Sequence, residues 1–258
     1  MRVAVAGGTG SVGRHVVASL AGAGHEPVVL TRSCGVDLIT GVGLDEARSG
    51  VQAVVDVSNV STVSSRASVA FFSTSTRNLL QAGRRNGVAH HVALSIVGSD
   101  LVGTGYYAGK LAQEELVLTG PVPATVLRTT QFHEFAGQLL TRIPGPLAIV
   151  PRMRMQPIAA CEVGQVLAEL AVTGPAGRVA DLAGPAVHDL LELARQLLRA
   201  SHSSRRVLAV RLPGAAGRAM ARGALLPAGS GPRGQQSFEE WLIESSAGNK
   251  LGDQQCAG

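Results

Sequence analysis

The chain is poor in the residues that mark several classes of protein. Only 3% of its 258 residues are aromatic, and its three cysteines stand far apart. Few aromatic side chains leave few platforms on which single-stranded bases stack. Isolated cysteines provide neither a disulfide framework nor a zinc-binding pair. No apolar run is long enough to span a bilayer. We therefore expect no nucleic-acid partner, no metal site and no membrane association.

The remaining composition is that of a globular α/β protein. Hydrophobic residues make up 45% of the chain and charged residues 16%, and the length suits either one large α/β domain or one domain with a small appendage. The net charge is +5, but the arginines are spread along the chain, so we interpret them as solvated surface. The odd number of thiols fits a reducing compartment, and the first predicted strand leaves no room for a signal peptide. We expect a cytoplasmic protein.

The amino-terminal stretch carries the strongest motif. Residues 3–6 form an apolar run that predicts a buried strand, and residues 12–20 have the apolar spacing of a helix. Gly7, Gly10 and Gly13 lie between them, as in a dinucleotide-binding turn. In such a turn the glycines allow a tight bend, close approach to a diphosphate and close helix packing. The helix N-terminus then faces the phosphates.

The end of the second predicted strand, residues 26–32, bears on the choice of cofactor. An acidic residue there holds the ribose hydroxyls of NAD, but this chain has Arg32, with Arg14 just beyond the glycine turn. Guanidinium groups suit a 2′-phosphate, so NADP(H) is favoured over NAD(H). The alternative is that both arginines are merely solvated. Asp37, in a short strand or extended piece at residues 36–38, lies either beside the adenine or in a polar turn.

Strands and helices then alternate. A fourth strand is predicted over residues 50–59, a fifth over 91–98 and a sixth over 124–128, with helices over 66–85 and 106–118. This alternation predicts a Rossmann-type, doubly wound parallel sheet with a small C-terminal substrate-binding region. The C-terminal part is predicted to contain helices over 162–171, 189–198 and 218–226, strands over 178–182 and 207–212, and a helix capped by Ser237. We divide the chain into a dinucleotide-binding core (1–135), a substrate-pocket region of the same compact body (136–244), part of which can return to the core, and a disordered tail (245–258).

Tyr106 and Lys110 are the best candidates for chemistry. They stand four residues apart on a predicted helix and therefore share one face. A nearby ammonium lowers the pKa of a phenol, and Ser95, at the end of the fifth strand, could hydrogen-bond the same substrate oxygen. The three residues could pass a proton to a carbonyl oxygen as a nicotinamide delivers hydride. A tyrosine and a lysine at this spacing also occur by chance in helices that have no catalytic role.

Five stretches together resemble the atypical short-chain dehydrogenase/reductases, and in particular their NmrA-like, NAD(P)H-binding branch. They are residues 7–13, 55–59, 94–98, 106–115 and 127–133, and the resemblance covers residues 1–170 well. It implies that Lys110 lies on the nicotinamide ribose and that Gln131 and Phe132 lie near the nicotinamide. The further cofactor contacts that it implies are Gly7, Thr9, Gly10, Ser11, Val12, Arg32, Ser58 and Asn59.

Three functions fit these observations. The first is an NADPH-dependent reductase of a carbonyl, enone or quinone. The second is a non-catalytic NAD(P)H-sensing regulator, and the third is an isomerase, epimerase or dehydratase that retains its cofactor. Phe132, Leu147, Met153 and Met155 suggest an apolar or aromatic substrate, although such residues also pack ordinary cores. The sequence leaves open whether the protein is a monomer or a homodimer.

Overall fold

The computed structural model describes residues 1–142 and 145–245, which form two compact units. Unit 1 contains residues 1–129 and 160–182, and unit 2 contains residues 130–159 and the chain from residue 183 onward. The chain therefore leaves unit 1 and returns to it before entering unit 2 for the second time. The predicted disordered tail, residues 245–258, lies outside the described residues except for Ser245.

Unit 1 is built on a six-stranded sheet in the order β2-β1-β3-β4-β5-β8, and all of its strand pairs are parallel. This sheet confirms the predicted Rossmann-type fold. Its strands are β1 (Arg2–Ala6), β2 (Glu26–Leu30), β3 (Ala53–Asp56), β4 (His90–Ile96), β5 (Ala124–Thr129) and β8 (Gly177–Arg178).

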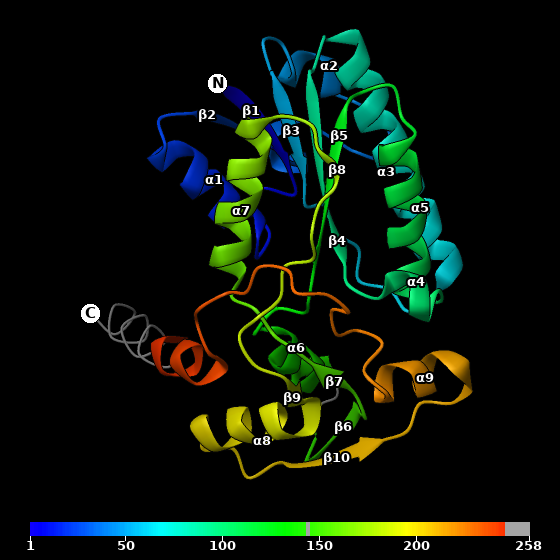
Figure 1. Cartoon of the computed structure of the whole chain (residues 1–258), viewed down its shortest axis with the longest axis vertical. Helices are drawn as coiled ribbons and strands as arrows, with labels where there is room; N and C mark the ends of the chain where they lie inside the picture. The colour runs from blue at the N-terminus through cyan, green and yellow to red at the C-terminus, as the bar shows by residue number, and fades with distance from the viewer. Residues whose placement is uncertain (143–144, 246–258) are drawn as a thin grey trace. The chain divides into compact units, whose positions relative to one another are not determined.

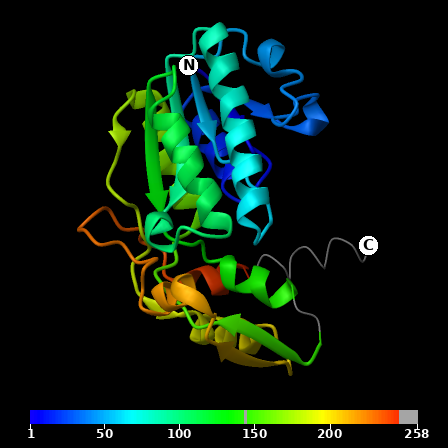
Figure 2. The same ribbon diagram turned by 90° about the vertical axis from the view of Figure 1, so that its right-hand side faces the viewer.

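Helices cover both faces of this sheet. Figure 1 shows α1 (Gly13–Gly22) and α7 (Ala160–Thr173) on one face, and α3 (Ser65–Arg85) and α5 (Tyr106–Leu118) on the other. Figure 2, turned by 90°, shows α3 and α5 running side by side. Because helices cover both faces, the central strands β1 and β3 are nearly continuous apolar runs rather than alternating ones. The short helices α2 (Leu44–Ala47) and α4 (Ser99–Val102) and the 3₁₀ turn η1 (Arg32–Cys34) complete the unit.

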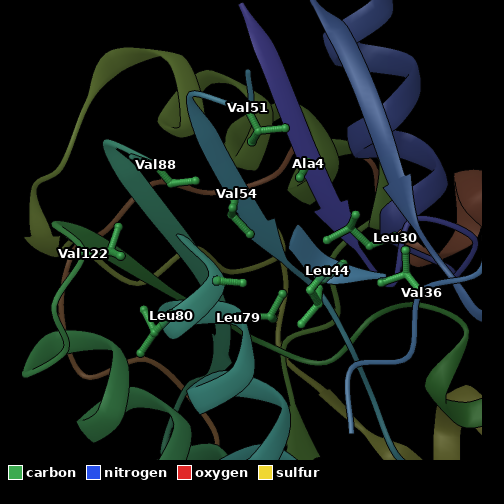
Figure 3. Packing of buried hydrophobic residues seen from close by; sticks show 12 residues of the cluster. Ala4, Leu30, Val36, Leu44, Val51, Val54, Leu79, Leu80, Val88 and Val122 are labelled. Carbon is green, nitrogen blue, oxygen red and sulfur yellow. The ribbon is translucent and has the colours of Figure 1, made fainter. Parts of the chain in front are cut away.

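One hydrophobic cluster joins the sheet to α3. Figure 3 shows Ala4 and Val54 from the sheet facing Leu79 and Leu80 from the helix. Each large aliphatic side chain that leaves water here contributes about 1.5–3 kcal/mol to folding. Helices α3 and α5 pack closely where Gly109 of α5 meets Ser68 of α3. A Cβ on Gly109 would lie only 2.6 Å from the backbone of Ser68. This contact fixes the height of Tyr106 and Lys110 relative to the sheet.

Unit 2 combines short helices with two small sheets. Strand β6 (Leu147–Pro151) pairs in parallel with β10 (Arg206–Val210), and β7 (Arg154–Met155) pairs antiparallel with β9 (His188–Asp189). The helices are α6 (Phe135–Arg142), α8 (Leu190–Ala200), α9 (Gly214–Ala221) and one over residues 238–245. The predicted cap of this last helix is confirmed, because the Ser237 N–H donates to Glu240 at 2.8 Å and the Glu240 N–H donates back to Ser237 Oγ at 3.2 Å.

Three predicted elements differ from the observed ones. Residues 36–38 form no strand, so the predicted fourth, fifth and sixth strands are β3, β4 and β5. The strand predicted over 178–182 is reduced to Gly177–Arg178, with Leu182 bridged separately to Thr129. The helix predicted over 218–226 spans Gly214–Ala221 instead, because it begins directly after Pro213. Proline tolerates this position, since the missing N–H has no partner at a helix start.

Candidate dinucleotide site and its polar network

The glycine turn between β1 and α1 has the form that a dinucleotide requires. Gly7 has a φ of +80°, a conformation that residues with a side chain rarely adopt, and a Cβ there would lie 2.8 Å from the Val57 carbonyl oxygen. A Cβ on Gly13 would lie 2.1 Å from the Gly7 carbonyl oxygen. The Gly10 N–H donates to the Gly7 carbonyl at 2.9 Å and closes the turn. Both glycines are therefore required by the backbone itself.

The first turn of α1 offers backbone N–H groups to an anion. The N-cap residue, Val12, provides no side-chain oxygen to them. Among the described residues, the N–H groups of Ser11, Val12 and Gly13 make no backbone hydrogen bond. Unpaired N–H groups and the positive end of the helix dipole together favour a phosphate. The turn therefore fits the diphosphate of a dinucleotide. Thr9, Gly10 and Ser11 are exposed beside it.

The segment after β2 places two of the predicted cofactor contacts together. Arg32 is exposed at the start of η1, and its charge helps lower the pKa of Asp37, although the main cause is hydrogen bonding from the Thr40 and Ile39 N–H groups. Those bonds to Asp37 Oδ1 measure 3.1 and 2.7 Å. Asp37 therefore organises its own turn, as one of the two interpretations expected. Its contact with adenine stays a prediction.

The end of β3 links the glycine turn to α5. Ser58 follows β3, and its buried Oγ has no hydrogen-bond partner in the part of the chain that the structure describes. The Ser58 N–H donates to Asp56 Oδ1 at 3.0 Å. Asn59 is exposed, and its Oδ1 accepts a hydrogen bond from the Tyr106 hydroxyl at 2.7 Å. The structure thus brings together Asn59 and Tyr106, two residues that the sequence assigned to different roles.

Tyr106 is held by aromatic neighbours. Its ring packs edge-to-face on Phe72 at 5.5 Å between centroids and on Tyr107 at 6.1 Å. Burial raises the pKa of Tyr106 far above its usual value, and the charges of Tyr107 and Asp56 act in the same direction. The lowered pKa expected from a nearby ammonium is therefore wrong for the protein as described, because burial, Tyr107 and Asp56 all raise the pKa of this phenol. Tyr106 is a protonated hydrogen-bond donor.

Lys110 is buried in a network that the sequence did not predict. Its Nζ lies 4.6 Å from the centroid of the Phe72 ring and donates to Gln113 Oε1. Gln113 Nε2 donates to Asp56 Oδ2 at 2.8 Å. Burial lowers the pKa of Lys110 to about 8, against the opposing effect of Asp56 and Glu114. Asp56 and Gln113 are the residues that sequence reasoning missed, since 57 positions separate them.

Ser95 belongs to a second buried cluster. Its Oγ donates to Glu114 Oε1, and Arg128 donates to both Glu114 oxygens at 2.8 and 2.9 Å. Asp100 accepts from Arg128 at 3.0 Å, and Arg178 also donates to Glu114. The hydroxyl of Ser95 is thus engaged with a carboxylate on α5, and only 1% of this residue is exposed. A role for Ser95 toward substrate stays a prediction that requires this bond to break.

Gln131 and Phe132 lie in unit 2, directly after β5. The side-chain amide of Gln131 is buried, and neither of its polar atoms is hydrogen-bonded within residues 1–142 and 145–245. The main-chain carbonyl of Gln131 accepts from the Ile158 N–H at 2.9 Å. Phe132 forms an isolated parallel bridge with Ile158. Their proximity to a nicotinamide stays a prediction.

Two further findings concern the described residues as a whole. Among residues 1–142 and 145–245, no group of three or more histidine, cysteine, aspartate or glutamate side chains is arranged to hold a metal ion. No helix in those ranges combines the length and apolar character needed to cross a bilayer.

The amino-terminal part of the chain matches one family model. Residues 3–126 match the NAD dependent epimerase/dehydratase family. This match and the parallel sheet confirm the resemblance to the atypical short-chain dehydrogenase/reductases, and they support an NAD(P)-dependent enzyme. The NmrA-like branch stays a prediction. No curated protein matches the chain significantly.

Solved structures share the fold at low sequence identity. A short-chain dehydrogenase/reductase superfamily protein from Agrobacterium tumefaciens with bound NAD is 20% identical with a TM-score of 0.69, and the match covers 99% of both chains. An NADPH-dependent quinone oxidoreductase from Escherichia coli complexed with NADPH is 18% identical with a TM-score of 0.71, covering 94% of this chain and 99% of that one. UDP-glucose 4-epimerase from Thermotoga maritima, solved with UDP-glucose, is 14% identical with a TM-score of 0.75, covering 98% and 99%.

Proposed function

We propose that the protein is an NADPH-dependent oxidoreductase that reduces a carbonyl, enone or quinone group of an apolar small molecule. The observation that carries this proposal is the glycine turn, with Gly7 at φ +80° and the unpaired N–H groups at the start of α1. Those groups would hold the diphosphate. Arg32, exposed at the end of β2, would face a 2′-phosphate through charge and paired hydrogen bonds.

Tyr106 would deliver the proton. Its raised pKa keeps the hydroxyl protonated at neutral pH, so it donates rather than accepts a hydrogen bond. That hydroxyl now points to Asn59, and a substrate carbonyl oxygen would replace the Asn59 oxygen as its acceptor. When bound, a reduced nicotinamide dinucleotide would supply the hydride for this reduction. Lys110, one helical turn further along α5, would place its positive charge beside the developing alkoxide and favour proton transfer.

The similarity to the E. coli quinone oxidoreductase supports a quinone among the candidate substrates. The test is consumption of NADPH by purified protein with a panel of quinones, enones and ketones. We expect Tyr106→Phe to lower turnover about 100-fold or more while cofactor affinity is kept. Tyr107→Phe is the matched control, since Tyr107 is the neighbouring tyrosine and packs edge-to-face on Tyr106. Equal activity of Tyr106→Phe and the unmodified protein would remove Tyr106 from the reaction.

Arg32 provides a separate test of cofactor choice. Losing a charge-assisted contact with the 2′-phosphate costs about 1.5–3 kcal/mol, so Arg32→Ala should weaken NADPH binding about tenfold or more. NADH carries no such phosphate, and its affinity should be unchanged. If both affinities fall together, Arg32 does not read the phosphate. If NADPH binds but no substrate is reduced, the protein fits the NAD(P)H-sensing alternative.

A second candidate is a cofactor-retaining epimerase or dehydratase. It is favoured by the match of residues 3–126 to the epimerase/dehydratase family and by the similarity to the T. maritima enzyme. Such an enzyme oxidises and re-reduces its substrate, so it consumes no net NADPH. Mass spectrometry of the purified protein would then find tightly retained dinucleotide, whereas the reductase would release its oxidised cofactor after each turnover.

A further inference from the structure

The net positive charge of the chain comes from unit 2. Unit 1 contains eleven basic and eleven acidic residues, whereas unit 2 contains twelve basic and seven acidic ones, so unit 2 carries the whole net charge of +5. The imbalance is sharpest over residues 193–238, which contain eight arginines and no acidic residue. In sequence these arginines are spread out, but the fold brings four of them to one place.

The turn between α8 and β10 gathers these arginines. Arg195 and Arg199 are four residues apart on α8 and share one face. The helix ends in a left-handed residue, His202 at φ +50°, and the Ser203 N–H donates back to the Leu198 carbonyl at 2.9 Å. The chain therefore reverses sharply, and β10 starts at Arg206 beside the end of the helix.

The result is a hollow of about 360 Å³ on the surface of unit 2. Its lining consists of four arginines and three other residues: Arg195, Leu198, Arg199, Ser203, Arg205, Arg206 and Val207. This volume is within the range of sites for small molecules. Every lining residue belongs to unit 2, so the hollow shares no residue with the glycine turn.

The four guanidinium groups are not equally engaged. Arg195 pairs with Glu192 at 2.8 Å, and Arg205 donates to the carbonyls of Gly145 and Leu140 at 2.8 and 2.9 Å. Among the described residues, the side chains of Arg199 and Arg206 form no hydrogen bond or ion pair. Arg199 lies in the last turn of α8, where the negative end of the helix dipole favours a cation. Arg205 and Arg206 lie beyond the helix, so the dipole does not explain their positions.

We propose that this hollow is a second ligand site, one that binds a phosphate-bearing anion. Guanidinium groups held around one space repel one another, and an anion with several oxygens removes this repulsion. Each planar guanidinium can also donate two parallel hydrogen bonds to a phosphate. Arg205 is already fixed by its two carbonyl partners, and the Ser203 hydroxyl adds a donor. Arg199 and Arg206 are the residues that gain partners when the anion binds.

The test measures binding of inorganic pyrophosphate to the full chain by calorimetry at low ionic strength. The variant Arg199→Gln/Arg206→Gln removes the two unpaired cations. Its matched control, Arg218→Gln/Arg222→Gln, removes the same charge from the same acid-free stretch but outside the hollow. Any pyrophosphate bound at the glycine turn contributes equally to both, so their difference reports the hollow. Thermal unfolding checks that both variants are folded.

We expect the first variant to lose about tenfold or more in affinity and the control less than about twofold. A second experiment measures binding to phosphatidylcholine vesicles with and without phosphatidic acid. Preferential binding to the acidic vesicles that is lost in Arg199→Gln/Arg206→Gln and kept in the control identifies a lipid headgroup as the ligand. Pyrophosphate binding without vesicle binding identifies a free phosphate compound. Equal weakening of both variants, or no binding of either probe by the unmodified protein, overturns the proposal.

Discussion

Gln113 joins Lys110 to Asp56 through the two ends of one amide group. Its Nε2 donates to Asp56 Oδ2 at 2.8 Å while its Oε1 accepts from Lys110 Nζ. All three side chains are buried. A neutral amide can donate to the carboxylate through its NH₂ group while its oxygen accepts from the ammonium. Opposite charges thus stabilise each other without direct contact.

The variant Gln113→Met should expose the importance of this amide. Methionine has a similar volume but cannot hydrogen-bond either charge, so both partners are left incompletely satisfied in a buried place. We expect the free energy of unfolding to fall by about 2–4 kcal/mol. Denaturant unfolding measures it. Gln81→Met, at an exposed position on α3, is the control and should change stability by less than about 0.5 kcal/mol. Equal effects of the two substitutions would contradict the network.

Lys110 should titrate near pH 8. Burial lowers its pKa to about 8, and the unfolded chain has the ordinary lysine value of 10.5. Between these values the unfolded chain binds more protons, so this group makes stability rise as the pH increases from about 8 to about 10.5. The chain has two lysines, and Lys250→Arg leaves Lys110 alone for nuclear magnetic resonance of isotope-labelled lysine. A titration midpoint at the ordinary lysine value would contradict the buried position.

Glu114 should stabilise unit 1 at neutral pH. Burial alone would raise the pKa of Glu114, but hydrogen bonds from Arg128 and Ser95 and the charges of Arg128 and Arg178 hold it below its usual value. This contribution is therefore present above the unfolded pKa and is lost as the pH falls through the folded one. Glu114→Gln should cost about 3 kcal/mol at pH 7, because buried Arg128 then keeps only Asp100 of its two carboxylate partners. Glu115→Gln, its exposed neighbour, should cost almost nothing. The measurement is the free energy of unfolding of both variants as the pH is lowered. Identical curves for Glu114→Gln and Glu115→Gln would refute this role.

The two ends of α1 should respond in opposite ways to the same substitution. Gly13→Ala forces a Cβ to within 2.1 Å of the Gly7 carbonyl oxygen, so it should distort the turn and abolish dinucleotide binding. Gly22, at the other end of the helix, has open space around it. Gly22→Ala should keep the affinity and stabilise the helix by up to about 1 kcal/mol. Calorimetric titration with NADPH and thermal unfolding compare them, and unchanged binding in Gly13→Ala would exclude this turn as the cofactor site.

The sequence predicted the parts of the fold whose causes are local. The glycine turn was identified because Gly7 needs a positive φ and Gly13 packs against Gly7 and Gly8, constraints that lie within a few residues. Helices α3 and α5 were placed within one residue of their observed bounds, Ser65–Arg85 and Tyr106–Leu118, since apolar spacing indicates them. The buried strands were recognised for the same reason. Only the short pieces were misplaced, as at residues 36–38, where apolar side chains anchor a loop rather than a strand.

The site depended on contacts that no local pattern contains. Ser95 was expected to face substrate, yet it turns to Glu114, 19 positions away. Strand alternation indicated in part that Ser95 points toward α5. Ala93 and Ser95 share one face of β4, and Ala93 packs on Val117 of α5. Asp56 and Gln113 offered no comparable signal. A buried carboxylate and a distant amide can be paired only when the crossing of β3 and α5 is known.

The return of the chain to unit 1 has a consequence for synthesis on the ribosome. Helix α7 packs against α1, and Gly164 allows this so closely that a Cβ there would lie 2.5 Å from that of His15. Until residues 160–173 leave the exit tunnel, the sheet face that α1 and α7 share is covered by α1 alone. The dinucleotide-binding half therefore cannot mature ahead of the intervening segment, residues 130–159, and a nascent chain arrested before residue 160 should still depend on chaperones.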